Sequence, residues 1–440
     1  MRASQRFSAR RAHAGLGGLI IAASTASGQL PNASPAAFAM GGNYTAMARG
    51  YEAVALNPAN LAAPGRPFIS FGALIQGGSF GLEPVDLTSF YKVRGTLVDS
   101  ATRASWVSLA RQSGRQRIRG DMGLTPLALS VGPIGLQAGL VMATNVDLSP
   151  DAFEALLFGN AGNSGGQPKT LNLLGTEVGA SVFATGAASF ALPLPLKLAG
   201  GLVSNEHLSI GFTGKYVIGA AFALARDAGS TFGSIGNIDF PMILPDTAAF
   251  NSIPNLGVGT GADMGLAWSA GGWRLGILAE NVFNSFKWDT TKLKFAPNKG
   301  VLDPSDSTSK INSDQQPFGA APQPLKDLVI AQAFKPAITI GVALKVTNFL
   351  TLTGDIHKQT GGDEAILIGP RDRMGVGAEL RILPFIALRS GIASVTDGWQ
   401  AGAGVGFHVL GYELGLSGSV RRRGAATESG ILVGLVGIGR

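Results

Sequence analysis

Histidines are the first residues to examine for chemistry, because the chain holds four of them and no cysteine. His207, His357 and His408 lie far apart, and none belongs to an HExxH helix, a nucleophile elbow or another paired motif. A single histidine in a strand is more often a hydrogen-bonded wall residue than a ligand or a general base. The sequence therefore predicts no catalytic residue, no metal site and no enzyme activity.

Two glycine-rich stretches resemble nucleotide-binding loops only superficially. "GVGTGADMG" and "GAGVGFHVLG" have the glycine density of such loops. Neither stands between a buried strand and a helix, which a dinucleotide fingerprint requires. Both alternate between small and apolar residues, so we interpret their glycines as strand residues and predict no cofactor.

Ionisable residues recur on the small, polar face of alternating segments. They are Lys215, Asp263, Arg274, Glu280, Lys345, Asp355, Arg373, Glu379, Arg381 and Arg389. In a functional interpretation they line a permeation path or contact the head group of an amphipathic ligand. In a structural interpretation they pair across neighbouring strands and hold an internal segment, which the near balance of signs favours.

Composition indicates a chain whose surface does not face water alone. Charged residues make up 14% of the chain, the mean hydropathy is positive, and glycine occurs 63 times in 440 residues. Soluble domains carry about 25% charged residues. No later window offers the 18 apolar residues that a spanning helix needs.

The N-terminus has the features of a secretory signal. Residues 1–28 begin with Arg2, Arg6, Arg10 and Arg11, continue with an apolar run and end in small residues. Without these four arginines the net charge falls from +7 to +3. The remaining charge is too balanced for a nucleic-acid partner, which requires a clustered basic face.

Period-two alternation dominates the rest of the chain. Between residues 338 and 346, Ile or Val or Leu occupies every even position, and Thr, Gly, Ala or Lys occupies the odd ones. About fourteen such runs lie near 68–79, 118–131, 133–145, 174–190, 207–224, 256–269, 272–288, 335–347, 349–358, 372–383, 385–394, 399–409, 411–421 and 429–439. Strands that are apolar on one face and small on the other are typical of outer-membrane barrels.

The sequence thus predicts an all-β fold, a transmembrane antiparallel β-barrel of about 14 strands that occupies residues 66–440. Long connections are expected at 80–117, 146–173, 225–255 and 289–334, with short helices in "TRASWVSLARQSGRQ" and "SPDAFEALLFGN". Six aromatic residues, which lie mostly near strand ends, are expected in interfacial girdles. They are Trp268, Trp273, Trp288, Trp399, Tyr412 and Phe385.

Residues 29–65 differ from the strands, since they are rich in small residues and do not alternate. A barrel of this size encloses a lumen that its own wall side chains cannot fill. Pro58 forces a turn at Asn57, and Asn57 and Asn60 can satisfy the backbone groups of that corner. We therefore expect these residues to form an N-terminal luminal hatch.

The leader, "GGNYTA", "EAVALNPANLA" and the first strand "FISFGALI" together resemble the FadL-type family of outer-membrane transporters and the related PorV-like proteins. In that family an Asn-Pro-Ala box closes an N-terminal hatch inside a 14-stranded barrel. Asn57, Pro58 and Ala59 match the box, and Asn60 follows it. The C-terminal "VGLVGIGR" departs from the aromatic terminus of many such barrels.

The resemblance implies passive transport of hydrophobic, fatty-acid-like small molecules across the bacterial outer membrane, past the hatch. Its expected partners are outer-membrane lipids and a hydrophobic ligand. The alternative is a PorV-like barrel that docks or shuttles secreted proteins through its long connections.

Overall fold

The fold is described from a computed structural model, which covers residues 30–159, 169–198, 205–246, 255–303, 305–306, 310–361, 369–396, 398–409, 412–423 and 426–438. Side chains are described up to Arg422. The expected secretory signal at residues 1–28 lies outside the described residues and stays a prediction.

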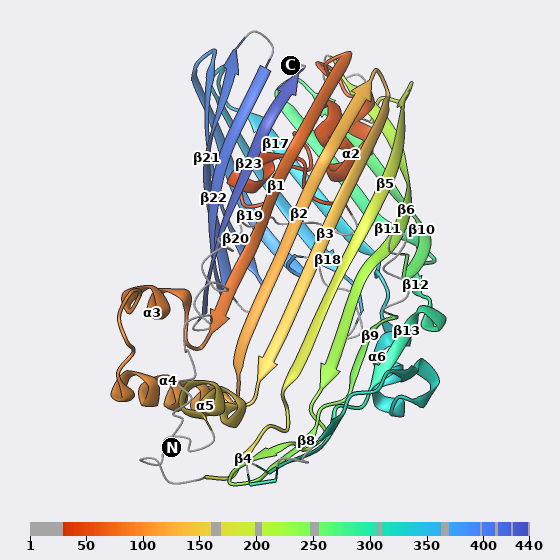
Figure 1. Ribbon diagram of the computed structural model, residues 1–440. Coiled ribbons are helices and arrows are strands. Elements are labelled where there is room, and N and C mark those ends of the chain that lie inside the picture. The colour runs from red at the N-terminus through yellow and green to blue at the C-terminus, as the bar shows by residue number, and fades with distance from the viewer. Residues whose placement is uncertain are drawn as a thin grey trace, which may run out of the picture.

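Fourteen long strands form one antiparallel ring (Figure 1). Each strand pairs with the next in this order, and the last pairs with the first between Phe71 and Ile438 at one end and Leu82 and Thr427 at the other. The strands are β1 (Ile69–Glu83), β2 (Gln116–Val131), β3 (Ile134–Leu148), β5 (Glu177–Leu194), β6 (His207–Arg226), β10 (Gly257–Ala270), β11 (Trp273–Asn284), β17 (Ala337–Lys345), β18 (Leu350–Gln359), β19 (Asp372–Leu383), β20 (Ile386–Val395), β21 (Gly398–Val409), β22 (Tyr412–Arg423) and β23 (Ala426–Ile438). The predicted barrel and its strand number are confirmed.

The two faces of the wall follow the predicted alternation. On β17, Ile340 exposes 48% of its surface outward, whereas Thr339 exposes 2% and faces the lumen. Large apolar residues are exposed in the same way on the other strands whose side chains are described. An outward apolar band around a closed ring is the surface of a transmembrane barrel. None of the described helices is long and apolar enough to cross a membrane.

The connections differ at the two ends of the barrel (Figure 1). Short turns such as Gly132-Pro133 and Gly271-Gly272 join strands at one end, which we call the short-turn end. The other, the long-loop end, carries α3 (Leu87–Lys92), α4 (Ser100–Ser113), α5 (Pro150–Phe158) and α6 (Gln323–Ala331). It also carries β4 (Leu171–Asn172), β7 (Thr231–Phe232), β8 (Gly236–Asp239), β9 (Met242–Pro245), β12 (Lys287–Trp288), η5 (Thr290–Lys292), β13 (Leu293–Ala296), β14 (Lys299–Leu302), β15 (Ile311–Asn312), β16 (Gln316–Pro317) and η6 (Phe318–Ala320). The two predicted helices are α4 and α5, and the Ser149 side chain caps α5 by accepting from the amide of Ala152 at 3.1 Å.

Before the first strand, the chain folds into a compact segment inside the ring (Figure 1). We call residues 30–65 the plug. It contains α1 (Pro35–Ala39), η1 (Gly50–Glu52), α2 (Ala53–Leu56) and η2 (Pro58–Ala62). Every residue from Leu30 to Ala63 is buried except the half-buried Arg49. The expected luminal segment is therefore present.

The girdle prediction is wrong for Trp288. Trp273, Trp399, Tyr412 and Phe385 are exposed on the outside of the barrel, but Trp288 is buried in the lumen. Its ring occupies the space above Gly219 of β6, where a β-carbon would come within 2.3 Å of Cζ3. A strand-end position alone does not tell an interfacial tryptophan from one that turns inward.

Candidate functional site

The plug is seated on glycines of the barrel wall. A β-carbon on Gly211 of β6 would come within 2.3 Å of the Ala59 nitrogen, and one on Gly391 of β20 within 2.2 Å of the Met40 carbonyl oxygen. Further wall glycines that lie against the plug are Gly135, Gly139, Gly265, Gly276, Gly341, Gly377, Gly402, Gly404 and Gly415. They occur on strands around most of the ring, so backbone and side-chain atoms of the plug touch the wall nearly all the way round.

The Asn-Pro-Ala corner lies against β6 and β10. The Asn57 side chain accepts from the Ala59 amide at 3.1 Å and donates to the Leu266 carbonyl at 3.1 Å. Asn60 donates to the Thr45 carbonyl at 2.9 Å, and Ser209 donates to the Ala59 carbonyl at 2.9 Å. Both asparagines are fully buried, so these bonds satisfy polar groups that would otherwise be costly to bury.

Asp355 on β18 is the strongest polar anchor of the plug. One of its carboxylate oxygens accepts from the Tyr44 amide at 3.1 Å, the Thr45 amide at 3.0 Å and the Thr45 hydroxyl at 2.6 Å. The neighbouring Thr353 donates to the Asn43 carbonyl at 2.7 Å. Four hydrogen bonds from these two side chains of β18 therefore fix the turn to the wall.

Lys215, Asp263 and Glu280 lie together beneath the plug. The Lys215 ammonium is 2.6 Å from Asp263 and donates to the Asn281 side chain at 2.8 Å. Glu280 precedes Asn281 on β11, and one of its carboxylate oxygens lies 3.7 Å from Nδ1 of His357. His357 is also 2.8 Å from the Thr339 hydroxyl through the same nitrogen. This histidine is thus a wall residue in a polar network.

Arg373 faces Glu280 across a small cavity between plug and wall. Gly42, Thr45 and Thr339 also line this cavity. A β-carbon on Gly42 would come within 2.3 Å of the Arg373 guanidinium, so the plug turn packs directly on this side chain. Arg373 and Asp355 therefore hold the same turn from adjacent strands.

A second group of charges lies on β19, β20 and β22. Glu379 binds Arg381 and Arg389 at 2.7 Å each, and Arg389 reaches Glu413 at 3.1 Å. Of these pairs, Glu379 and Arg389 join neighbouring strands, as the structural interpretation expects, whereas Arg381 shares β19 with Glu379 and Glu413 lies two strands from Arg389. Their predicted role in permeation or ligand contact stays a prediction.

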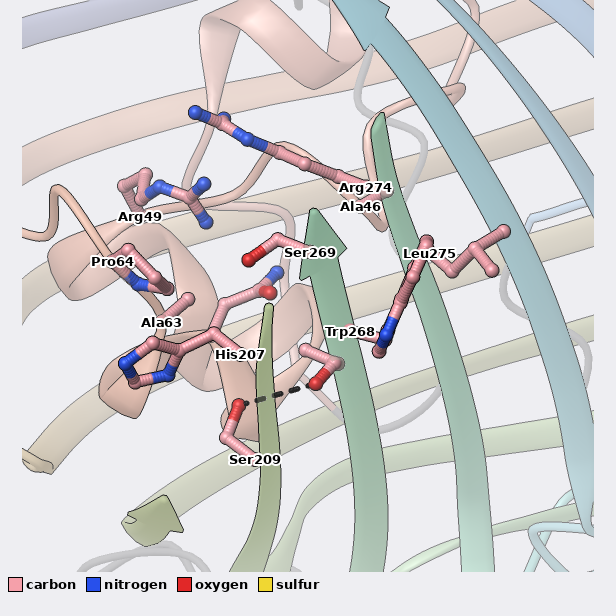
Figure 2. Close-up of a pocket in the computed structure, with 12 residues that line it drawn as sticks. Ala46, Arg49, Ala63, Pro64, His207, Ser209, Trp268, Ser269, Arg274 and Leu275 are labelled. Carbon is pink, nitrogen blue, oxygen red and sulfur yellow. Dashed lines mark hydrogen bonds between the residues drawn. The ribbon is translucent and has the colours of Figure 1, made fainter. Parts of the chain in front are cut away.

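Arg274 and Lys345 lie apart from both groups. Lys345 is exposed at the end of β17, and Arg274 is half-buried at the short-turn end. Figure 2 shows Arg274 extended beside Arg49 of the plug, with His207 across the same cavity.

The half of the lumen nearer the long-loop end is lined on one side by a buried cluster of aromatic rings, which we call the aromatic cluster. Its rings lie 4.7 to 5.5 Å from their neighbours, in tilted and edge-to-face arrangements. Its members are Phe183, Phe222, Phe286, Trp288 and Phe334. Trp288 donates to Gln332 at 2.9 Å, which ties the cluster to the connection after α6.

The sequence analysis did not identify these aromatic residues as a site, nor the wall residues Ser209 and Thr353 that bind the plug. The inward parity of both residues was readable, since Thr353 shares a face with Asp355 and His357, and Phe183 shares one with Thr185 and Ser189. Which inward residues meet the plug depends on its position, which alternation does not encode.

Within the part of the chain that the structure describes, no group of three or more His, Asp or Glu residues could hold a metal ion.

The fold and the site define a class: a 14-stranded transmembrane β-barrel with an N-terminal plug packed in its lumen and an aromatic lining beside it.

No family model matches the sequence. None of the curated proteins matches it either. Among solved structures, the chain is similar to the monoaromatic hydrocarbon channel CymD (10% identity, TM-score 0.49, 92% of this chain and 97% of that one). It is similar to the P. putida toluene transporter TodX (12%, 0.48, 94% and 99%) and to a Pseudomonas aeruginosa FadL homologue (10%, 0.45, 93% and 99%). These similar structures include a FadL homologue, the type of barrel that the sequence resembles, and the resemblance to PorV-like proteins stays a prediction.

Proposed function

We propose that this barrel passively carries hydrophobic, fatty-acid-like small molecules across the bacterial outer membrane, and that residues 29–65 act as its hatch. The observation that carries the proposal is the arrangement of the lumen. The plug, buried from Leu30 to Ala63 apart from the half-buried Arg49, occupies the half nearer the short-turn end, and the aromatic cluster lies in the other half. An apolar solute gains free energy on the aromatic wall, and the plug then decides whether it passes.

The proposed route starts at the long-loop end. A hydrophobic molecule leaves the outer leaflet or the medium and displaces part of the aromatic cluster, since ring–ring contacts can be exchanged for ring–ligand contacts of similar strength. It then meets the polar belt formed by Lys215, Asp263, Glu280, Asp355 and Arg373. Movement of the plug turn away from Asp355 opens the way past this belt.

No chemical step is needed for this function. The proposal is a passive, non-catalytic role in which the wall charges hold the plug and keep water-filled leakage low. The PorV-like alternative, docking of secreted proteins on the long connections, stays a prediction that a pull-down would test.

Replacing Trp288 with alanine tests the aromatic cluster as the binding wall. We expect affinity for oleate to fall about tenfold, because fully burying an aromatic side chain against an apolar partner contributes about 1.5–3 kcal/mol. The measurement is equilibrium binding of radiolabelled oleate to the purified barrel, with toluene as a second probe.

Trp399→Ala is the matched control, because Trp399 is exposed on the lipid face. It should bind oleate as the parent protein does. Unchanged oleate and toluene binding in a folded Trp288→Ala barrel would remove the aromatic cluster from the route.

A further inference from the structure

The connection between β1 and β2 forms a side arm of the barrel. We call residues 84–115 the arm and residues 87–98 the arm tip. In Figure 1, α3 and α4 lie beyond the outline of the ring, at the height where the strands end on the long-loop side. Because they lie outside this outline, they stand beside the barrel and do not cover its lumen.

The arm is rigidly attached. At its base the Gln116 side chain accepts from the Val85 amide at 3.1 Å and donates to the Val85 carbonyl at 3.0 Å. Trp106 and Val107 of α4 pack with Phe153 of α5 in a separate core. Such a core holds the arm in one orientation relative to the wall.

Ion pairs add to this attachment. Arg111 of α4 binds Asp151 at 2.6 Å and also binds Glu154, both of α5. The hydrogen bond to Glu154 raises the pKa of the Arg111 guanidinium above its ordinary value, and Asp151 adds to the effect. These ion pairs join α4 to α5 without any side chain of the arm tip.

The arm tip presents apolar and basic side chains outward. Leu97 exposes 99% of its surface and Tyr91 66%. The neighbouring Phe90 instead packs on Trp106 of α4, with the two ring centroids 4.7 Å apart. Lys92 and Arg94 are exposed beside them, with the Arg94 guanidinium 4.6 Å above the Tyr91 ring. A leucine this exposed loses apolar contact unless something else covers it.

The two acids that flank the arm tip are engaged as helix caps. Asp86 accepts from the Ser89 amide at 2.8 Å, and Asp99 accepts from the Thr102 amide at 2.8 Å. The bond from the Thr102 amide also lowers the pKa of the Asp99 carboxyl below its ordinary value. Between these two caps the arm tip itself carries Lys92 and Arg94 and no acidic residue.

The arm tip continues the lipid-facing band of the wall. On β1 that band still includes Phe80, which is exposed outward, and the strand ends at Glu83, just before the arm. The arm therefore leaves the wall where hydrocarbon gives way to head groups. Segments with exposed apolar side chains and nearby Lys or Arg bind this interface, since the apolar groups enter the acyl boundary and the cations meet lipid phosphates.

We propose that the arm tip is a lipid-binding element that inserts Leu97 and Tyr91 into the outer leaflet and places Lys92 and Arg94 against its phosphate groups. The partner is the membrane surface in which the barrel stands. This role fixes the barrel's depth and rotation in the leaflet, and it does not depend on what passes through the lumen.

A single attached probe tests the insertion, because the chain has no native cysteine. Leu97→Cys and, as control, Leu174→Cys are labelled with an environment-sensitive fluorophore and reconstituted in phosphatidylglycerol-containing bilayers. Leu174 is exposed in the connection between β4 and the start of β5 at Glu177. At Leu97 we expect quenching by spin-labelled lipid to be about threefold stronger than at Leu174, and quenching by aqueous iodide to be weaker.

Equal lipid quenching at the two positions would overturn the proposal, and would indicate an arm tip that meets an aqueous partner. The charge component is tested with the Lys92→Gln/Arg94→Gln double variant. Lipid quenching of the Leu97 label should drop on going from phosphatidylglycerol-containing to pure phosphatidylcholine bilayers, and the double variant should abolish this difference. A difference that persists in the double variant would remove Lys92 and Arg94 from the contact.

Discussion

Asp355→Ala should convert a closed barrel into a leaky one. The substitution removes the acceptor of three hydrogen bonds from the plug turn and leaves the Tyr44 and Thr45 amides without it. Hydrogen bonds to charged groups contribute about 1.5–3 kcal/mol each. A loss of about 3 kcal/mol of anchoring raises the population with a displaced plug about 100-fold. The measurement is ion conductance of the purified barrel in a planar bilayer.

Asp121→Ala is the matched control for this result. Asp121 is also a carboxylate inside the ring, but its hydrogen bond with Ser79 joins β1 to β2. Its loss should leave conductance near that of the parent protein. Asp355→Asn should lie between the two, because the amide keeps an acceptor and loses the charge. If the conductance of the Asp355→Ala barrel equals that of the parent protein, contacts other than those of Asp355 are sufficient to hold the plug.

Gly211→Ala should unseat the Asn-Pro-Ala corner by adding one methyl group. That methyl would lie 2.3 Å from the Ala59 nitrogen and 2.4 Å from the Pro58 carbonyl carbon, both backbone atoms that cannot rotate away. Overpacking a tight interface costs about 1–3 kcal/mol, so either the plug or the wall must shift. We expect faster proteolysis within residues 30–65 and a raised conductance.

Gly214→Ala, three residues along the same strand, has nothing within 4 Å of its added carbon. It should behave as the parent does in both assays. If Gly211→Ala resisted proteolysis as well as Gly214→Ala and had the same conductance, close packing of the plug on the wall glycines would not be needed to hold it in place.

Much of the fold could be predicted because a barrel wall repeats a single local rule. Alternation placed Ile340 outside and Thr339 inside, and the fourteen runs found all fourteen wall strands. Pro58 and Asn57 marked the plug corner because proline geometry and asparagine capping are local properties.

The arrangement inside the lumen could not be predicted in the same way. Alternation placed Lys215, Asp263 and Glu280 on the inner face, but their grouping depends on which strands are neighbours and in what register. It did not separate Arg274 and Lys345, at the short-turn end, from that group. Trp288 was assigned to the interface because no local signal reports the empty space above Gly219.

If movement of the plug controls the passage of hydrophobic molecules, a disulfide that fixes the plug to the barrel wall should block this passage. A β-carbon on Gly377 of the wall would stand 3.0 Å from Cβ of Met40 in the plug, so Met40→Cys/Gly377→Cys needs a shift of about 1 Å to reach disulfide spacing. The Ser189→Cys/Thr213→Cys pair is the control, because these hydroxyls, 2.8 Å apart, belong to adjacent wall strands.

The measurement is uptake of radiolabelled oleate by cells that carry each variant, before and after mild reduction. We expect the plug-to-wall disulfide to stop uptake, reduction to restore it, and the wall-to-wall disulfide to leave uptake unchanged before and after reduction. Full uptake through a barrel whose plug is shown to be crosslinked would mean that passage does not need movement of the plug. The plug would then be a fixed part of the wall.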